Sequence, residues 1–75
     1  MNKGQYLNLF YDARLTLKIE VIELEELINT LIKNDIDIDG INRLSISSAI
    51  LSIQYKDFQK FKEIFNKYDG SYEII

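Results

Sequence analysis

Apolar residues in the first half of the chain recur at alternating spacings of three and four positions, which is the period of one face of an α-helix. A similar pattern follows in the second half, and no Gly or Pro interrupts either stretch, 5–33 or 41–69. The acidic segment Asn34–Gly40 separates the two stretches. The pattern predicts an all-α fold, a helical hairpin of two long antiparallel helices. The predicted elements are a helix over about 5–33, an acidic turn over 34–40, a helix over about 41–69 and a short C-terminal tail over 70–75.

Each predicted helix has apolar residues on two sides, although a hairpin partner covers only one side. In the first helix the main apolar row comprises Leu7, Phe10, Leu17, Val21, Leu24, Ile28 and Leu31, with Arg14 as its one polar member. In the second helix one row comprises Ile46, Ile50 and Ile53. Because a chain of 75 residues has too little material to cover the remaining rows, we predict self-association into a dimer or larger assembly. The side chains predicted to form this contact are Leu15, Ile19, Ile22, Leu44, Leu51 and Tyr55.

One segment also fits a strand. Residues Arg14–Val21 alternate polar and apolar without interruption, which is the period of a β-strand. If this segment is a strand, its expected partner is Ser71–Ile75, and the fold is a small α+β domain. The helix is preferred because no turn residue separates Val21 from the helix-favouring residues 23–27. A break in the second helix near Ser45–Ser48 is a further alternative, because serines lower helix propensity.

Composition excludes several classes of protein. The chain has 75 residues and a mass of 8.8 kDa, which suits one small domain. It has no Cys and no His, so it has no thiolate to bind a metal and lacks the commonest zinc ligand and the usual general base. We therefore predict that the protein is not an enzyme and holds no cofactor or metal. No apolar run approaches the ~20 residues of a membrane span, and the first residues lack the apolar core of a signal peptide, so we expect a cytoplasmic protein without a membrane partner.

The acidic turn has the spacing of half a calcium loop. The alternate carboxylates of Asp35–Asp39, followed by Gly40, match the first half of an EF-hand loop. The twelfth position of that loop, normally a bidentate Glu, is Ile46. Losing this residue removes two of about seven oxygen ligands, so calcium binding is not expected. The simpler interpretation is a turn in which the intervening isoleucines point inward and Asp39 caps the next helix.

Two charged clusters also have simple explanations. Lysines alternate with aromatic residues over Lys56–Lys67, an arrangement that can bind single-stranded nucleic acid. The aromatic residues share one stripe of an amphipathic helix, however, and the whole chain has a net charge of −3, so nucleic acid is not the expected partner. The acidic cluster that includes Glu20, Glu23 and Glu26 is expected to be a solvated surface.

The remaining interpretation is a small non-enzymatic protein-interaction module that binds itself and another protein. Thirteen Ile, seven Lys and six Asn, against two Arg and no Pro, indicate an AT-rich coding sequence. Together with the small size and the acidity, this bias suggests an accessory protein of a phage or plasmid, an inhibitor or adaptor of a host protein. The alternative is a small regulator that binds nucleic acid through Lys56–Lys67 or calcium through the Asp35–Asp39 turn.

Overall fold

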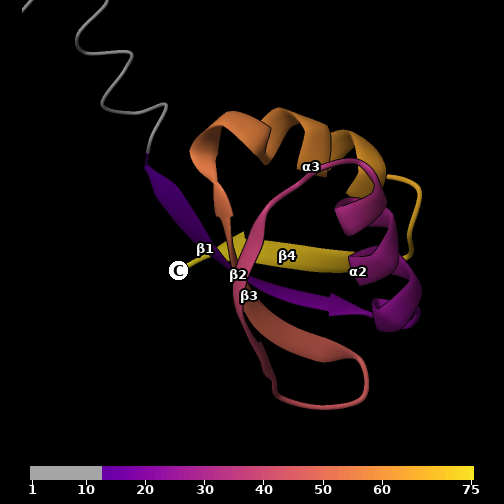
Figure 1. The fold of residues 1–75 in the computed structure, drawn as a ribbon. Coiled ribbons are helices and arrows are strands. Elements are labelled where there is room, and N and C mark those ends of the chain that lie inside the picture. The colour runs from indigo at the N-terminus through magenta and orange to yellow at the C-terminus, as the bar shows by residue number, and fades with distance from the viewer. Residues whose placement is uncertain (1–12) are drawn as a thin grey trace, which may run out of the picture.

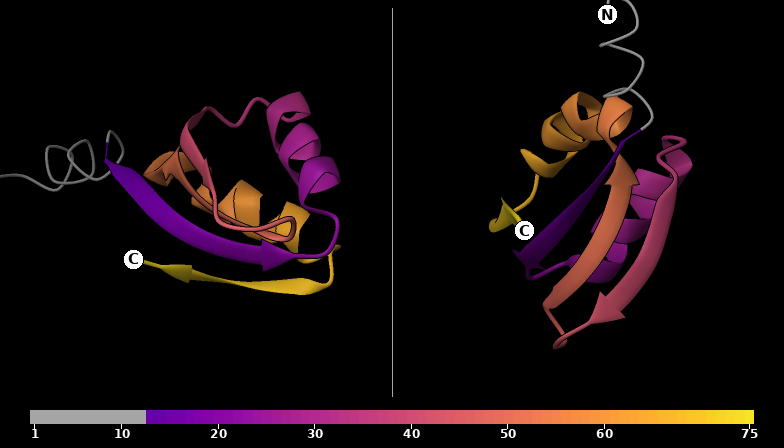
Figure 2. Two further views of the ribbon diagram at one scale, coloured as in Figure 1. Left: turned by 90° about the horizontal axis from the view of Figure 1, so that it is seen from below. Right: turned by 90° about the vertical axis from the view of Figure 1, so that its left-hand side faces the viewer.

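The computed structural model describes residues 13–75. The elements in chain order are β1 (Arg14–Val21), α2 (Leu24–Lys33), β2 (Ile38–Arg43), β3 (Ser48–Gln54), the short 3-10 helix η1 (Tyr55–Asp57), α3 (Phe58–Phe65) and β4 (Gly70–Ile74). Both α-helices lie on the same face of the sheet (Figures 1 and 2). The described part of the chain is therefore an α+β fold with one layer of helices on one sheet.

The four strands within residues 13–75 form one antiparallel sheet in the order β2-β3-β1-β4. β1 is central, and it pairs with β3 along seven positions and with β4 along five. Each strand–helix–strand unit, β1-α2-β2 and β3-α3-β4, crosses over one strand before it rejoins the sheet. This is the split βαβ arrangement of a β-α-β-β-α-β chain. It leaves β2 and β4 as the outer strands.

The core lies between the sheet and the helices. Successive side chains of a strand point to opposite faces, so the alternate residues Leu17, Ile19 and Val21 of β1 are buried together. The other buried apolar side chains of the helices and of β3 are Leu24, Leu27, Ile28, Leu31, Ala49, Leu51, Ile53, Phe61, Ile64 and Phe65. Tyr72 packs edge-on against Phe61, with ring centroids 5.2 Å apart, which fixes β4 to α3.

The predicted first helix is wrong over Arg14–Val21, which is a strand. The alternative α+β interpretation agrees with the structure, because β1 pairs with β4 and β4 overlaps the expected partner Ser71–Ile75. The strand period brings Leu17 and Ile19 onto one face, although a helical period places them in different rows. Residues 5–12 of the predicted helix lie outside the described residues.

The connection between β1 and α2 explains why the sequence pattern favours a continuous helix. It consists only of Ile22 and Glu23, with no Gly, Pro or Asn to indicate a turn. α2 then begins at Leu24 with Glu25 and Glu26 in its first turn, where negative charge stabilises the helix dipole. A strand and a helix thus follow each other without the local signals that usually separate them.

The second predicted helix is also wrong over most of its length. Residues 38–43 and 48–54 form the β2–β3 hairpin, and α3 spans only Phe58–Phe65. The alternative break near Ser45–Ser48 coincides with the turn of this hairpin. The hydroxyl oxygens of Ser45 and Ser48 are 2.7 Å apart there. Asp39 lies in β2 and does not cap a helix. The helical hairpin with two long helices is therefore overturned by a sheet of four strands within residues 13–75.

Candidate protein-interaction surface

Exposed apolar side chains gather at the end of the sheet where β1 ends and the β2–β3 hairpin turns. Ile46 is 93% exposed, Ile22 is 77% exposed and Leu44 is 48% exposed. The backbone N–H of Val21 donates to the carbonyl oxygen of Ser47 over 2.8 Å, which places the β1–α2 connection beside the hairpin turn. We call Ile22, Leu44 and Ile46 the hairpin-end patch. Ile46 and Ile22 are the two most exposed large hydrophobic side chains of the described residues.

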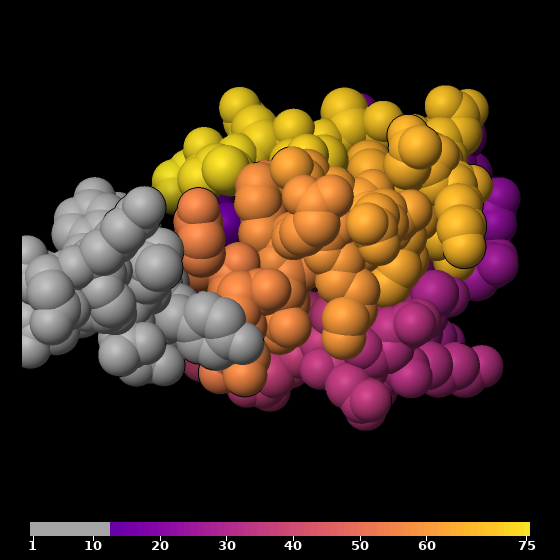
Figure 3. Space-filling view, turned by 90° about the horizontal axis from the view of Figure 1, so that it is seen from above, coloured from indigo at the N-terminus to yellow at the C-terminus, as the bar shows by residue number. Residues whose placement is uncertain are grey.

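A second exposed region follows the outer edge of β4. A groove of about 410 Å³ separates β4 from α3, and its lining residues are Gln59, Lys62, Glu63, Phe65, Asn66 and Tyr72. Figure 3 shows α3 between β4 on one side and α2 on the other. Ile74 and Ile75, where the strand ends, are 54% and 60% exposed. The groove therefore combines an aromatic wall, a polar helix face and a strand edge.

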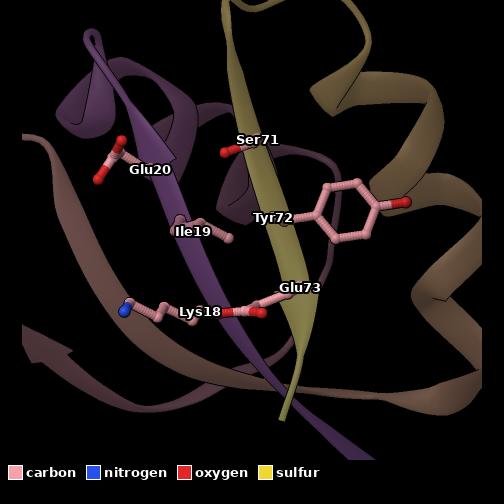
Figure 4. A pocket seen from close by; sticks show the side chains of 6 residues that line it. All are labelled: Lys18, Ile19, Glu20, Ser71, Tyr72 and Glu73. Atoms are coloured by element: carbon pink, nitrogen blue, oxygen red, sulfur yellow. The ribbon is translucent and has the colours of Figure 1, made fainter.

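On the sheet face opposite the helices, the surface between β1 and β4 is polar. Lys18, Glu20, Ser71 and Glu73 line a shallow pocket of about 330 Å³ between β1 and β4. Figure 4 shows Lys18 and Glu73 on neighbouring strands, whereas the ring of Tyr72 points away toward α3. The pocket thus presents charges of both signs on an open, hydrophilic surface.

Arg14 ties β1 to the segment that precedes β2. Its Nε donates to the Ser52 hydroxyl over 3.0 Å, its Nη2 donates to the Asp37 carbonyl oxygen over 3.2 Å, and its Nη1 is 3.6 Å from an Asp37 carboxylate oxygen. Asp35, with φ of 62°, occupies a left-handed turn, and Asp39 lies in β2. Within residues 13–75 no group of three acidic side chains is placed to hold a metal ion.

The predicted acidic surface is divided between two faces of the molecule. Glu20 lines the pocket on the open sheet face. Glu23 directly precedes α2 and Glu26 lies in its first turn, and both line a pocket of about 440 Å³. A hydrogen bond with Glu26, its negative charge and slight desolvation together raise the pKa of the Glu23 carboxyl. In the same pocket the hydroxyl oxygens of Thr30 and Tyr68 are 2.9 Å apart and link α2 to the segment after α3.

The six side chains predicted to form the self-association contact do not lie on one surface. Ile19 and Leu51 are fully buried in the core, and Leu15 is partly buried against it. The other three are exposed: Ile22, Leu44 and Tyr55. Tyr55 follows the end of β3, whereas Leu44 precedes its start. Only Ile22 and Leu44 therefore belong to the hairpin-end patch. The aromatic stripe of the Lys56–Lys67 segment is turned inward, with Phe61 and Phe65 buried.

The prediction missed Ile46 and the groove beside β4. A helical period places Ile46 in one row with Ile50 and Ile53, which both lie in β3. In the structure Ile46 lies in the hairpin turn that precedes β3. Ile74 and Ile75 carried a usable signal, because adjacent residues of a strand point to opposite faces and one of two consecutive isoleucines must leave the core. The groove had no sequence signal, because it forms only when α3 packs against β4.

Comparison with known proteins assigns the chain to a family. Residues 9–75 match the family described as putative stage IV sporulation protein YqfD, and the chain belongs to this family. No curated protein and no solved structure matches it. No helix within residues 13–75 is long and apolar enough to cross a membrane. The match to a sporulation family overturns the expectation of a phage or plasmid accessory protein.

Proposed function

We propose that this member of the YqfD family is a non-enzymatic protein-interaction domain that serves sporulation by binding itself and another protein. The observation that carries the proposal is the hairpin-end patch. Its side chains extend from two connections and contribute little to the core, since Ile46 and Ile22 are mostly exposed. Large apolar side chains that are exposed at one end of a sheet, on connections joined by a backbone hydrogen bond, are candidates for a site that another molecule covers.

The exposed fractions set the scale of the binding energy. Fully burying an Ile side chain contributes ~1.5–3 kcal/mol. Ile46 is 93% exposed and Ile22 is 77% exposed, so covering both would contribute about 3–5 kcal/mol. Because association itself costs free energy, this gain is one contribution to the binding of a partner and not the whole of it.

The surroundings of the patch indicate the chemistry of its partner. A shallow pocket of about 190 Å³ lies next to Ile22, and Glu20, Ser47 and Asp69 are among its lining residues. An apolar centre with a polar rim is the usual anatomy of a protein–protein contact. Because the two charged residues of this rim are acidic, the expected partner presents an apolar side chain flanked by Lys or Arg.

Site-specific photo-crosslinking in cells tests the proposal. A benzophenone amino acid replaces Ile46 in one variant and the exposed Lys33, at the end of α2, in a matched control variant. We expect discrete adducts of this chain with another protein from position 46, and only background from position 33. Identical adduct patterns from both positions would contradict a binding surface at the hairpin end.

A further inference from the structure

We propose that β4 pairs with β4 of a second copy of this chain in antiparallel orientation, so that the two sheets join into one. The inference rests on the proposed function and names one surface and one partner for it. The surface is the outer edge of β4 with the groove beneath α3. A second copy fits because the backbone register and the charges along this edge are both self-complementary.

The two outer strands of the described sheet differ in how well their edges are protected. In β2 the register shifts between Asp39 and Asn42, and Gly40 has φ of 65°, so that edge is distorted by a bulge. In β4 the five pairs with β1 follow one another without irregularity. A regular, uncovered edge strand is where another strand adds to a sheet, whereas a bulge opposes such pairing. The edge of β4 is therefore the one open to a second strand.

Hydrogen bonding shows which backbone groups of β4 face outward. The N–H of Ile75 donates to the carbonyl oxygen of Thr16 in β1 over 3.0 Å. Because bonding alternates along an antiparallel strand, the odd-numbered residues 71–75 direct their backbone groups toward β1. The even-numbered residues 70–74 then direct theirs to the outer edge, where no described strand meets them. These groups can form about six backbone hydrogen bonds with the same residues of a second copy.

The charges select one register. Pairing the even-numbered residues with one another permits a two-fold axis at Ser71, Tyr72 or Glu73. An axis at Glu73 places its carboxylate opposite that of the second copy, and an axis at Ser71 places Asp69 opposite Glu73. Like charges directly opposite each other are destabilising. The axis at Tyr72 avoids both contacts, because it places Ser71 opposite Glu73.

The face of α3 above the groove is complementary to itself about the same axis. Its polar residues lining the groove are Gln59, Lys62, Glu63 and Asn66. The ring of Tyr72 lies 5.2 Å from that of Phe61 and 5.1 Å from that of Phe65, which places the axis near the middle of this row. The axis reverses the row, so Lys62 of one copy is directed toward Glu63 of the other, and Gln59 toward Asn66. Two ion pairs related by symmetry then close the groove from above, each between opposite charges.

Ile74 gains cover in this arrangement. It is 54% exposed in the single chain, although it follows Tyr72 by two residues and so lies on the same sheet face. In the second copy the residue opposite it is Gly70, which has no side chain. Ile74 can therefore enter the groove that Phe65 and Tyr72 line, where an apolar side chain replaces water.

Disulfide trapping tests the register, because the chain has no Cys. Chains with Ser71→Cys are mixed with chains that carry Glu73→Cys and are oxidised mildly. These positions face each other in a pair without hydrogen bonds, where Cα atoms approach to ~4.5 Å and a disulfide can form. We expect mixed disulfide dimers to exceed same-variant dimers about tenfold. Ser52→Cys, on β3, is the control and should crosslink with neither variant.

A second set of variants tests the edge and the charges. Ile74→Pro removes one outward N–H from each copy and no bond to β1, whereas Ile74→Val keeps the donor and an apolar side chain. Sedimentation should show dimerisation weakened about tenfold by the first change and little altered by the second. Lys62→Glu should also weaken the dimer, and adding Glu63→Lys to it should restore the association.

Equal yields of mixed and same-variant disulfides would overturn the proposed pairing, as would an Ile74→Pro chain that dimerises like the wild type. Either result leaves the photo-crosslinking from Ile46 intact, because that position lies in the hairpin turn and outside β4. Conversely, loss of specific crosslinks from Ile46 rejects the hairpin-end patch and does not affect the β4 disulfides. The failures of the two proposals are thus distinguishable.

Discussion

Gly70 starts β4 so close to β1 that a side chain has no room. A Cβ at this position would lie 2.9 Å from both the Cα and the Cβ of Val21, and it would press on the carbonyl oxygen of Glu20. Carbon atoms in contact are normally about 3.5–4.0 Å apart. Val21 is almost fully buried, so it cannot move aside into solvent. Overpacking of this kind costs about 1–3 kcal/mol, and Gly70→Ala should lower the Tm of a domain this small by about 5–20 °C.

Gly40→Ala is the matched control for thermal unfolding followed by circular dichroism. Gly40 has φ of 65°, but no atom lies within 4 Å of where its Cβ would be, so Ala adds backbone strain without a clash. That strain costs about 1–2 kcal/mol. We expect both variants to be destabilised and Gly70→Ala to melt lower. A Gly70→Ala chain that melts at or above the Gly40→Ala chain would refute the argument from close approach.

Three further predictions concern the patch, the acidic turn and the acidic pair. Ile46→Ser should leave the unfolding free energy within about 0.5 kcal/mol of the wild type while it weakens binding of the other protein. Ile19→Ala, in the core, should cost about 2–5 kcal/mol in urea titrations. Millimolar calcium should shift the Tm by less than about 2 °C, because Asp35, Asp37 and Asp39 are not placed together to hold a metal ion. A large upward shift that Asp35→Asn abolishes would show a calcium site. Because the folded state raises the pKa of Glu23, its protonation favours folding below the usual pKa, and this contribution is lost as pH rises through the raised value. Carboxyl NMR titration should show a lower pKa of Glu23 in the Glu26→Gln chain. In the Glu23→Gln chain the unfolding free energy should change less with pH over the range in which Glu23 titrates.

The part of the fold that could be predicted is the part in which local pattern and burial agree. The end of the first predicted helix at Lys33 matches the end of α2, and the aromatic stripe from Phe58 to Phe65 matches the buried face of α3. The strand period of Arg14–Val21 was also readable. The sequence pattern nevertheless favours the helix interpretation, because Val21 and Leu24 lie three residues apart, a helical spacing, and no turn residue separates them.

The rest depends on contacts that the pattern does not contain. The hairpin turn depends on Leu44 and Ser45, whose backbone N–H groups donate to the carbonyl oxygen of Ser48, and serines alone do not indicate that geometry. Ile46 can be recognised as an exposed residue only after the strands on either side of it are paired. The groove beside β4 requires residues of α3 and β4 to meet. Binding surfaces of this kind follow from tertiary packing, so sequence reasoning identified two members of the patch, Ile22 and Leu44, and not the surface itself.

Sedimentation equilibrium across the micromolar range tests most directly whether this chain associates with itself. Self-association predicts a weight-average mass that rises from 8.8 kDa toward twice that value with concentration, together with a Tm that rises in parallel. In the same experiment Ile74→Pro should weaken the association, because it alters the edge of β4, whereas Ile46→Ser, in the hairpin turn, should not. A folded species of 8.8 kDa at every concentration would contradict self-association.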